Sequence, residues 1–327
     1  MPISDAFMNN YKEKHSLLAA AQCLSMAAIA ISLAGCEAAL DLSGVNTTLD
    51  NPVRRTDQIQ GLAQNTQAQV AVGNFGLVLH RTRGSEDWHR LELPGQPGLI
   101  DIATCPDEQF VALGFERDLW LGDKNAGQWQ SKPIPTSENL LAVTCAPDGT
   151  IWAVGSFSSL YSSSDAGDSW AEFSLNEDAM LTSIQFLTAD IAYATGEFGL
   201  VIKTEDAGEQ WQVLAPIQAE FYPQTTFFSD EQTGWAVGLD GTVYQTTNGA
   251  GSWQLSDTGV DAPLYQVVEH DSSPLLLGDN ATVLTRTADQ WQPLALSIAP
   301  VFLRAGLVDN QRLLLAGGNG VLLSVDL

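Results

Sequence analysis

Residues 192–211 read AYATGEFGLVIKTEDAGEQW, and variants of this stretch recur along the chain. It contains an apolar run that ends at Gly196, a short turn, a second apolar run, and a polar loop that ends at Trp211. Short apolar and β-branched runs bounded by Gly, Asp and Asn are typical of β-strands joined by tight turns. The stretch therefore predicts strands rather than helices.

Two residue types mark the same period. The tryptophans lie 41, 41, 41, 42 and 38 residues apart, at Trp88, Trp129, Trp170, Trp211, Trp253 and Trp291. The glycines lie 41, 41, 41, 42, 40 and 40 residues apart, at Gly73, Gly114, Gly155, Gly196, Gly238, Gly278 and Gly318. A unit of about 40 residues has room for four short strands and is typical of propeller blades. We predict an all-β protein, a seven-bladed β-propeller of four-stranded antiparallel blades over residues 53–327.

The last unit, Val301–Leu327, supplies three strands and lacks a strand that starts at a tryptophan. The segment Val45–Arg55 precedes the first full unit. We expect this N-terminal segment to complete the last blade, because such a closure removes exposed sheet edges.

Residues 1–35 have the pattern of an export signal. Lys12 and Lys14 precede the apolar run Leu17–Ser32, which is short for a membrane span. The sequence Leu-Ala-Gly-Cys that ends at Cys36 resembles the lipobox of bacterial lipoproteins. We therefore predict a lipoprotein signal peptide over 1–35, and an acylated Cys36 with a polar tether over 36–52. A secretory signal with an unmodified Cys36 is the alternative, and Met1 and Met8 are both possible starts.

The resemblance to lipoproteins also implies a location. Glu37, which is not Asp, follows the cysteine. In lipoproteins this implies the cell envelope, with the anchor in the outer membrane and the domain facing the periplasm.

The charge is strongly negative. The formal net charge is −25, and the charges of the first 35 residues cancel, so 12 basic and 37 acidic residues remain in the rest of the chain. Such a surface repels phosphate backbones, and we expect no nucleic-acid partner. The excess fits either general solubility, as in a saline habitat, or a docking face for a basic partner.

Two cysteines occupy equivalent places in adjacent repeats, in Ala103–Pro106 and Val143–Ala146. An oxidising periplasm permits a disulfide between Cys105 and Cys145. Two buried thiols fit the sequence equally well, because disulfide geometry is strict.

Loops before two tryptophans share the pattern S/T-x-D-x-G-x-x-W, which resembles the Asp-box. The matching residues are Ser163, Asp165, Gly167 and Trp170 in one loop and Thr204, Asp206, Gly208 and Trp211 in the next. An Asp side chain can accept backbone hydrogen bonds within such a turn, and Gly can take a positive φ. We interpret these residues as structural, and we expect neither metal binding nor catalysis from them.

Taken over nearly the whole chain, the repeat resembles the photosystem II stability and assembly factor-like family of Asp-box (bacterial neuraminidase repeat) propellers. This resemblance implies a non-catalytic protein that assists the assembly of a membrane complex. Members in phototrophs use a basic patch, whereas arginine is sparse here. The resemblance then implies a scaffold or stability factor for another membrane protein complex, such as a transport system.

A carbohydrate-active propeller, either a sialidase-like glycoside hydrolase or a glycan binder, is the alternative function. A sialidase needs three converging arginines and a Tyr–Glu pair, and no such triad is evident. Tyr265 and Glu269 lie close in the sequence but on a strand that reads as blade core. The three histidines after the signal lack metal-ligand spacing. We predict no enzyme activity, no cofactor and no metal.

Phenylalanine recurs in the turns between the second and third strands of the first four blades. The turns contain Phe75, Phe115, Phe157 and Phe198, whereas the last three contain Leu239-Asp240, Asp279-Asn280 and Asn319-Gly320. Turn tips are normally polar. Either each Phe is buried over a neighbouring blade, or the four form an apolar arc that binds a peptide or a loop of a membrane protein. In the second case Glu116, Arg117 and Glu197 form its rim. Independently of this choice, we expect a monomer.

Overall fold

The computed structural model describes residues 44, 50–270, 273–287 and 290–327. The chain divides into two compact units, Met1–Asp50 and Asn51–Leu327. The predicted signal peptide, Cys36 and most of the tether lie outside the described residues. No helix among the described residues has the length and the apolar character of a membrane span.

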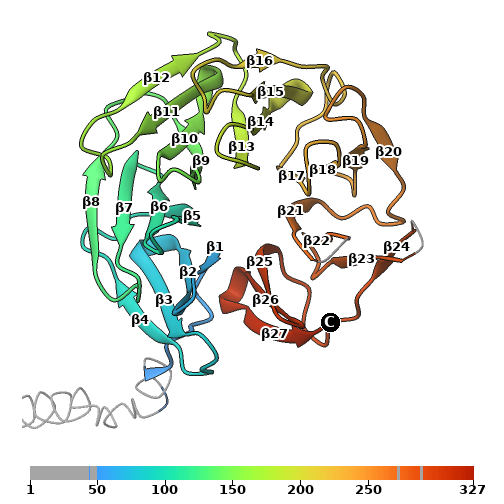
Figure 1. Cartoon of the computed structure of the whole chain (residues 1–327). Helices are drawn as coiled ribbons and strands as arrows, with labels where there is room; N and C mark the ends of the chain where they lie inside the picture. Colours follow the sequence, from blue (N-terminus) through green and yellow to red (C-terminus); the bar gives the residue numbers. More distant parts are fainter. Residues whose placement is uncertain (1–43, 45–49, 271–272, 288–289) are drawn as a thin grey trace, which may run out of the picture. The chain divides into compact units, whose positions relative to one another are not determined.

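Asn51–Leu327 forms a ring of seven antiparallel sheets (Figure 1), as predicted. Within each sheet the strands lie in chain order, the first toward the centre of the ring (Figure 1). All strands of the described residues belong to this unit, which contains its own core.

Blades 1 to 4 have four strands each. Blade 1 has β1 (Ile59–Gln64), β2 (Ala68–Gly73), β3 (Leu77–Thr82) and β4 (His89–Glu92); blade 2 has β5 (Leu99–Thr104), β6 (Phe110–Gly114), β7 (Asp118–Gly122) and β8 (Trp129–Pro133). Blade 3 has β9 (Leu140–Cys145), β10 (Ile151–Gly155), β11 (Ser159–Ser163) and β12 (Ala171–Ser174); blade 4 has β13 (Leu181–Phe186), β14 (Ala192–Gly196), β15 (Leu200–Thr204) and β16 (Gln212–Val213).

Blades 5 and 6 also have four strands, and blade 7 has three. Blade 5 has β17 (Thr225–Phe228), β18 (Gly234–Val237), β19 (Val243–Thr246) and β20 (Gln254–Ser256); blade 6 has β21 (Leu264–Val268), β22 (Leu275–Gly278), β23 (Val283–Thr287) and β24 (Gln290–Pro293). Blade 7 has β25 (Leu303–Asp309), β26 (Arg312–Gly317) and β27 (Leu322–Asp326). Four 3-10 turns connect second to third strands: η1 (Asn74–Gly76), η2 (Ser156–Ser158), η3 (Glu197–Gly199) and η4 (Gly318–Gly320).

The core lies between blades. The second strand of each blade is the most deeply buried, and the apolar clusters combine residues of adjacent blades. The Trp152 and Trp211 rings meet edge to face at 5.9 Å between blades 3 and 4, and Tyr193 stacks on Phe228 at 3.9 Å between blades 4 and 5. Apolar burial of this kind dominates the stability of the ring.

The periodic glycines have a steric cause. A Cβ at Gly73 would overlap the carbonyl oxygen of Gln58, and one at Gly196 would overlap that of Met180. The same oxygens accept hydrogen bonds from the next amides, those of Asn74 (3.2 Å) and Glu197 (2.9 Å). The approach of the entering chain therefore excludes side chains at these two glycines, whereas the atom nearest to such a Cβ at Gly114 of blade 2 is the Asp118 carbonyl oxygen, at 3.3 Å.

The seventh position of the glycine series needs a correction. It is Gly317 that pairs with Leu303 and lies against the carbonyl of Phe302, whereas the predicted Gly318 begins the following turn. The period is therefore 39 residues at the last step, because 317 minus 278 is 39.

The expected fourth strand of blade 7 does not form in residues 50–55, the described part of Val45–Arg55. Pro52 has no amide hydrogen to donate to a sheet, and the amide of Arg54 donates to the Asp57 carboxylate at 2.7 Å in a local turn. Among the described residues, β27 is the outermost strand of its sheet.

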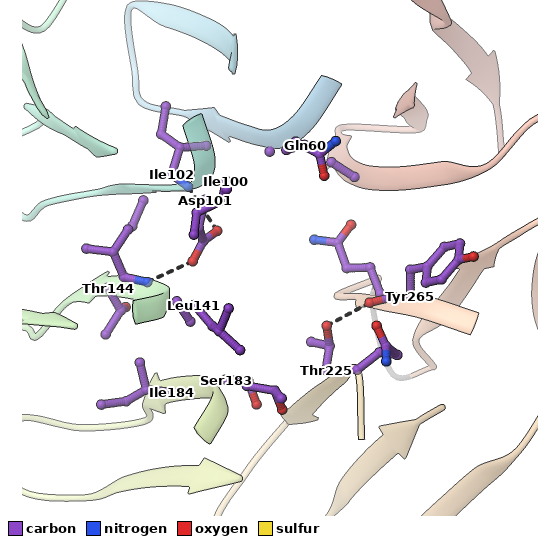
Figure 2. A pocket seen from close by; sticks show the side chains of 18 of the residues that line it. Gln60, Ile100, Asp101, Ile102, Leu141, Thr144, Ser183, Ile184, Thr225 and Tyr265 are labelled. Carbon is purple, nitrogen blue, oxygen red and sulfur yellow. Dashed lines mark hydrogen bonds between the residues drawn. The ribbon is translucent and has the colours of Figure 1, made fainter. Parts of the chain in front are cut away.

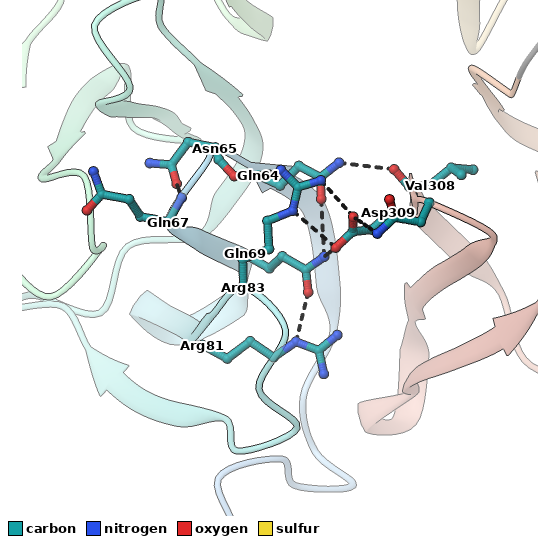
Figure 3. Close-up of polar contacts among 9 residues, drawn as sticks. Gln64, Asn65, Gln67, Gln69, Arg81, Arg83, Val308 and Asp309 are labelled. Carbon is teal, nitrogen blue, oxygen red and sulfur yellow. Dashed lines mark hydrogen bonds and ion pairs between the residues drawn. The ribbon is translucent and has the colours of Figure 1, made fainter.

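Polar contacts join blade 7 to blade 1 instead (Figure 3). Arg83 pairs with Asp309 at 2.6 Å, and Gln69 donates to the same carboxylate at 3.2 Å. Gln64 donates to the carbonyl of Val308 at 3.0 Å, and Arg312 pairs with Glu86 at 2.8 Å. Within the described residues, these side-chain contacts join the last blade to the first.

Candidate binding face

The chain direction assigns the loops to two faces. Every turn from the second to the third strand of a blade lies on the same face as the linkers between blades. Backbone hydrogen bonds tie the two together, as from Gly76 to Pro97 (2.6 Å) and from Gly199 to Phe221 (2.8 Å). We call this the turn face. The loops that precede the tryptophans lie on the opposite face.

Six of the seven turns on this face share one geometry. In each, the amide of the fourth residue bonds the carbonyl of the first, and both central residues have positive φ. This is the arrangement of a type I′ turn, which favours Asn-Gly. The first central residues are Phe75, Phe157, Phe198, Asp240, Asn280 and Asn319.

The four phenylalanines are exposed. The exposed fractions are 68% for Phe75, 60% for Phe115, 50% for Phe157 and 62% for Phe198. Burial over a neighbouring blade, the alternative considered from the sequence, is therefore excluded. Leu239, which precedes Asp240 in the turn of blade 5, is also 50% exposed. We call Phe75, Phe115, Phe157, Phe198 and Leu239 the apolar arc.

Three members of the arc are in an unfavourable backbone conformation. Phe75, Phe157 and Phe198 have φ of 54°, 55° and 60°. The left-handed region suits Asn and Asp but costs a bulky residue roughly 1–2 kcal/mol. Asn319 holds the same position in blade 7 with φ 54°. The turn does not need Phe for its own stability.

The predicted rim residues have different surroundings. Glu116 is exposed next to Phe115, and Arg117 is half-buried. Glu197 accepts a hydrogen bond from the amide of Met180 at 2.8 Å, so it also fixes the linker before blade 4.

A channel of about 320 Å³ runs between the first strands of all seven blades. Figure 2 shows its side chains, with Asp101 and Tyr265 on opposite sides. Asp101 accepts hydrogen bonds from the amides of Ile102 (2.9 Å) and Val143 (2.8 Å). Desolvation raises the pKa of its carboxyl to about 6, although these two bonds oppose the shift.

Other polar groups of the channel bridge neighbouring blades. Thr225 donates to the carbonyl of Tyr265 at 2.7 Å, and Gln266 accepts from the amide of Gly306 at 2.6 Å. The Arg304 guanidinium lies 5.4 Å from the Tyr265 ring, and burial lowers its pKa. The polar lining thus holds the ring together, and neither Asp101 nor Arg304 was singled out from the sequence.

The loops that resemble Asp-boxes are held by their own side chains. Asp165 accepts from the Ser169 hydroxyl (2.6 Å), the Ser169 amide (2.8 Å) and the Ser163 hydroxyl (2.8 Å), and Ser163 accepts from the amide of Gly167 (2.8 Å). These bonds, that from the Ser169 hydroxyl first, lower the pKa of Asp165 to about 2. Because all of these contacts lie within the loop, Asp165 stabilises the conformation of the loop itself.

The second such loop repeats the pattern. Asp206 accepts from the Thr204 hydroxyl and from the amide of Gln210, both at 2.8 Å, and Thr204 accepts from Gly208 at 2.9 Å. Trp170 and Trp211 pack on the clusters between blades.

Cys105 and Cys145 form a disulfide, with their Cα atoms 5.0 Å apart. The bond joins the ends of the first strands of blades 2 and 3. Both blades carry a residue of the apolar arc, and we call blades 1 to 5, which carry the arc, the apolar half of the ring.

No catalytic or metal-binding constellation emerges in the described part of the chain. Groups of three or more His, Cys, Asp or Glu that could hold a metal ion are absent from it. Tyr265 lines the channel, whereas Glu269 follows the far end of β21 and is exposed. Four strand residues span about 13 Å, so the two do not form a pair.

Comparison with known proteins supports the fold, and one family model matches part of the chain. Residues 122–215, from the end of β7 through blade 4, match the model of the family described as Photosynthesis system II assembly factor YCF48. This segment includes both loops that resemble Asp-boxes. Among curated proteins, none matches the sequence.

Solved structures give the same architecture at low identity. YCF48 bound to D1 peptide is 12% identical, with a TM-score of 0.69 over 85% of this chain and 96% of that one. YCF48 from Cyanidioschyzon merolae is 14% identical, with a TM-score of 0.68 over 84% and 97%. Virginiamycin B lyase from Staphylococcus aureus is 11% identical, with a TM-score of 0.73 over 83% and 95%. The chain has the seven-bladed propeller fold of these structures, and its segment 122–215 is similar to the YCF48 family.

Proposed function

We propose that this YCF48-like propeller is a non-catalytic scaffold that uses its turn face to bind a segment of a membrane protein and so assists assembly or stability of a membrane complex. The exposed phenylalanines in left-handed conformations are the observation that carries the proposal. Their exposure to water and their strained backbone both destabilise the fold, which favours a role in binding over a role in stability.

The surroundings of the arc support a binding role over an enzymatic one. Aromatic side chains supply a large contact area with few rotatable bonds, and they dominate interface energies. The channel polar groups are engaged in contacts between blades. YCF48 has been solved with a D1 peptide bound, which supports peptide binding as a capacity of this architecture.

We further propose that Cys36 anchors the protein in the outer membrane, facing the periplasm, where a transport system would be a suitable partner. The Cys36→Ser variant is expected to leave the membrane fraction and appear in the soluble envelope fraction. Membrane retention of that variant would contradict the anchor but would leave the proposed binding face intact.

The binding face is tested with paired variants. Phe157→Ser with Phe198→Ser should abolish capture of membrane proteins after crosslinking in cells, without loss of folded protein. Val213→Ser with Leu255→Ser is the matched control, because these residues are 59% and 66% exposed but lie on outer strands. An identical set of captured membrane proteins from both pairs would contradict the proposal.

A further inference from the structure

The charges of the turn face differ sharply from those of the seam between blades 7 and 1. Of the nine arginines after the signal, seven lie in the entering segment, blade 1 or blade 7: Arg54, Arg55, Arg81, Arg83, Arg90, Arg304 and Arg312. Most of them are paired with local acids, as Arg90 is with Asp57 at 2.9 Å and Arg81 with Glu86 at 3.1 Å. The acids of this seam are therefore neutralised within the protein.

The acids around the apolar arc are not neutralised in this way. The turns and linkers of blades 2 to 5 on this face carry nine acids: Glu116, Glu138, Glu177, Asp178, Glu197, Glu220, Asp240, Asp257 and Asp261. The same segments carry one cation, Arg117. The carboxylates of six of the nine accept no hydrogen bond and form no ion pair within the described residues: Glu116, Glu177, Asp178, Glu220, Asp240 and Asp261.

This arrangement specifies the partner that the apolar arc fits. Exposed apolar side chains bind most strongly to apolar groups of a partner. A surface with charges of one sign attracts a partner of the opposite charge and repels one of the same charge. Glu116 adjoins Phe115, and Asp240 adjoins Leu239, so charge and apolar surface alternate along the face. A complementary segment carries the same alternation with the opposite charge.

We infer that the arc binds a cationic segment in which Lys or Arg alternates with large apolar side chains. This inference rests on the proposed function and gives the chemistry of its partner. An acidic segment of the same hydrophobicity is excluded by repulsion. A neutral one binds more weakly and with little dependence on salt.

Two synthetic peptides of about 12 residues, roughly 40 Å when extended, test the inference. One alternates Leu with Lys, and the other alternates Leu with Glu. Their binding to the unit Asn51–Leu327, which contains all seven sheets, is measured by fluorescence anisotropy at low and high salt. We expect the Leu–Lys peptide to bind at least tenfold more tightly, and high salt to remove most of that difference.

Variants that remove two negative charges beside the arc, or two on the opposite face, show whether the peptide is attracted by the charges near the arc or by the overall charge of the protein. Glu116→Gln with Asp240→Asn should weaken Leu–Lys binding roughly tenfold, since both residues adjoin the arc. Asp87→Asn with Glu209→Gln removes the same charge from the opposite face and should change binding less than twofold. Equal losses in both pairs would mean that only the overall negative charge attracts the peptide, and would overturn the inference.

The remaining outcomes distinguish the inference from the proposed function. Equal binding of both peptides, lost with Phe157→Ser and Phe198→Ser, overturns the cationic partner and leaves the binding face. Failure of both peptides to bind, or binding that ignores the Phe changes, overturns both.

Discussion

Phe198 in blade 4 and Asn319 in blade 7 occupy the same position of the same turn. Both have positive φ, at 60° and 54°, and both are followed by glycine. Blade 7 has the residue that the turn itself prefers, whereas blade 4 has one that the turn tolerates at a cost. The comparison separates what the fold requires, a residue compatible with a left-handed backbone, from what it does not require, an exposed aromatic ring.

The two parts of the ring also differ in how their blades are joined. Blades 2 and 3, in the apolar half, are joined by the disulfide and by the Asp101 carboxylate. Blades 7 and 1 are joined by ion pairs and side-chain amides, and by an apolar cluster that includes Leu77 and Ala316.

Replacing the phenylalanines of the turns by asparagine, the residue found in blade 7, should have the largest effect on binding. The variant with Phe75→Asn, Phe157→Asn and Phe198→Asn should lose at least a hundredfold in partner affinity, because central aromatic residues contribute about 2 kcal/mol or more each. Its stability should be unchanged, or higher by up to about 1 kcal/mol per site, because backbone strain is relieved. Anisotropy with the Leu–Lys peptide and urea unfolding measure the two effects. A loss of stability that parallels the loss of affinity would show that the rings support the fold.

Removing the disulfide tests how much the bond between blades 2 and 3 contributes to stability. Cys105→Ser with Cys145→Ser should lower the free energy of unfolding by about 2–4 kcal/mol, since the bond closes a loop with a sequence separation of 40. Urea unfolding of the variant and of the oxidised protein gives the difference. Mass spectrometry without reductant that finds two free thiols would contradict the crosslink itself.

The buried carboxyl of Asp101, which joins blades 2 and 3, should make the stability of the protein depend on pH. Its folded pKa, about 6, is above the unfolded value of about 4, so the folded state holds the proton more tightly. Stability should therefore fall as pH rises from about 4 to about 6, by roughly 2–3 kcal/mol, and stay lower above that range. The Asp101→Asn variant should flatten this part of the profile. An unchanged slope between pH 4 and 6 in that variant would assign the dependence to other groups.

The reverse exchange should have the smallest effect. Asn319→Phe places an aromatic ring in the polar half and should lower stability by about 1 kcal/mol through backbone strain. It should not raise affinity for the cationic peptide, because the segment that lies against this turn contains Arg54 and Arg55, which repel cations. Tighter binding by this variant would show that any exposed ring on the turn face suffices.

Much of the ring was predictable because its repeat is regular. The tryptophan and glycine spacings predicted the blade number and the strand order, since each residue type marks a position that recurs in most blades. The predicted closing strand does not form in residues 50–55, because the turn between Arg54 and Asp57 depends on a hydrogen bond that spacing does not reveal.

The candidate site was only partly predictable. The four phenylalanines were identified from their turns, but exposure depends on how each turn packs against the next linker. Leu239 was grouped with the polar turns because Asp240 follows it, although alignment by glycine places it next to the arc. Asp101 and Arg304 were missed because strand register, rather than a motif, brings them to the channel.

The most direct test places a photo-crosslinking amino acid at position 157 in one variant and at position 319 in another, both on the turn face. The account predicts a crosslinked adduct with a membrane protein from position 157 and none from position 319. Equal yields of that adduct from both positions, or an adduct from position 319 alone, would contradict the claim that the apolar arc is the binding surface.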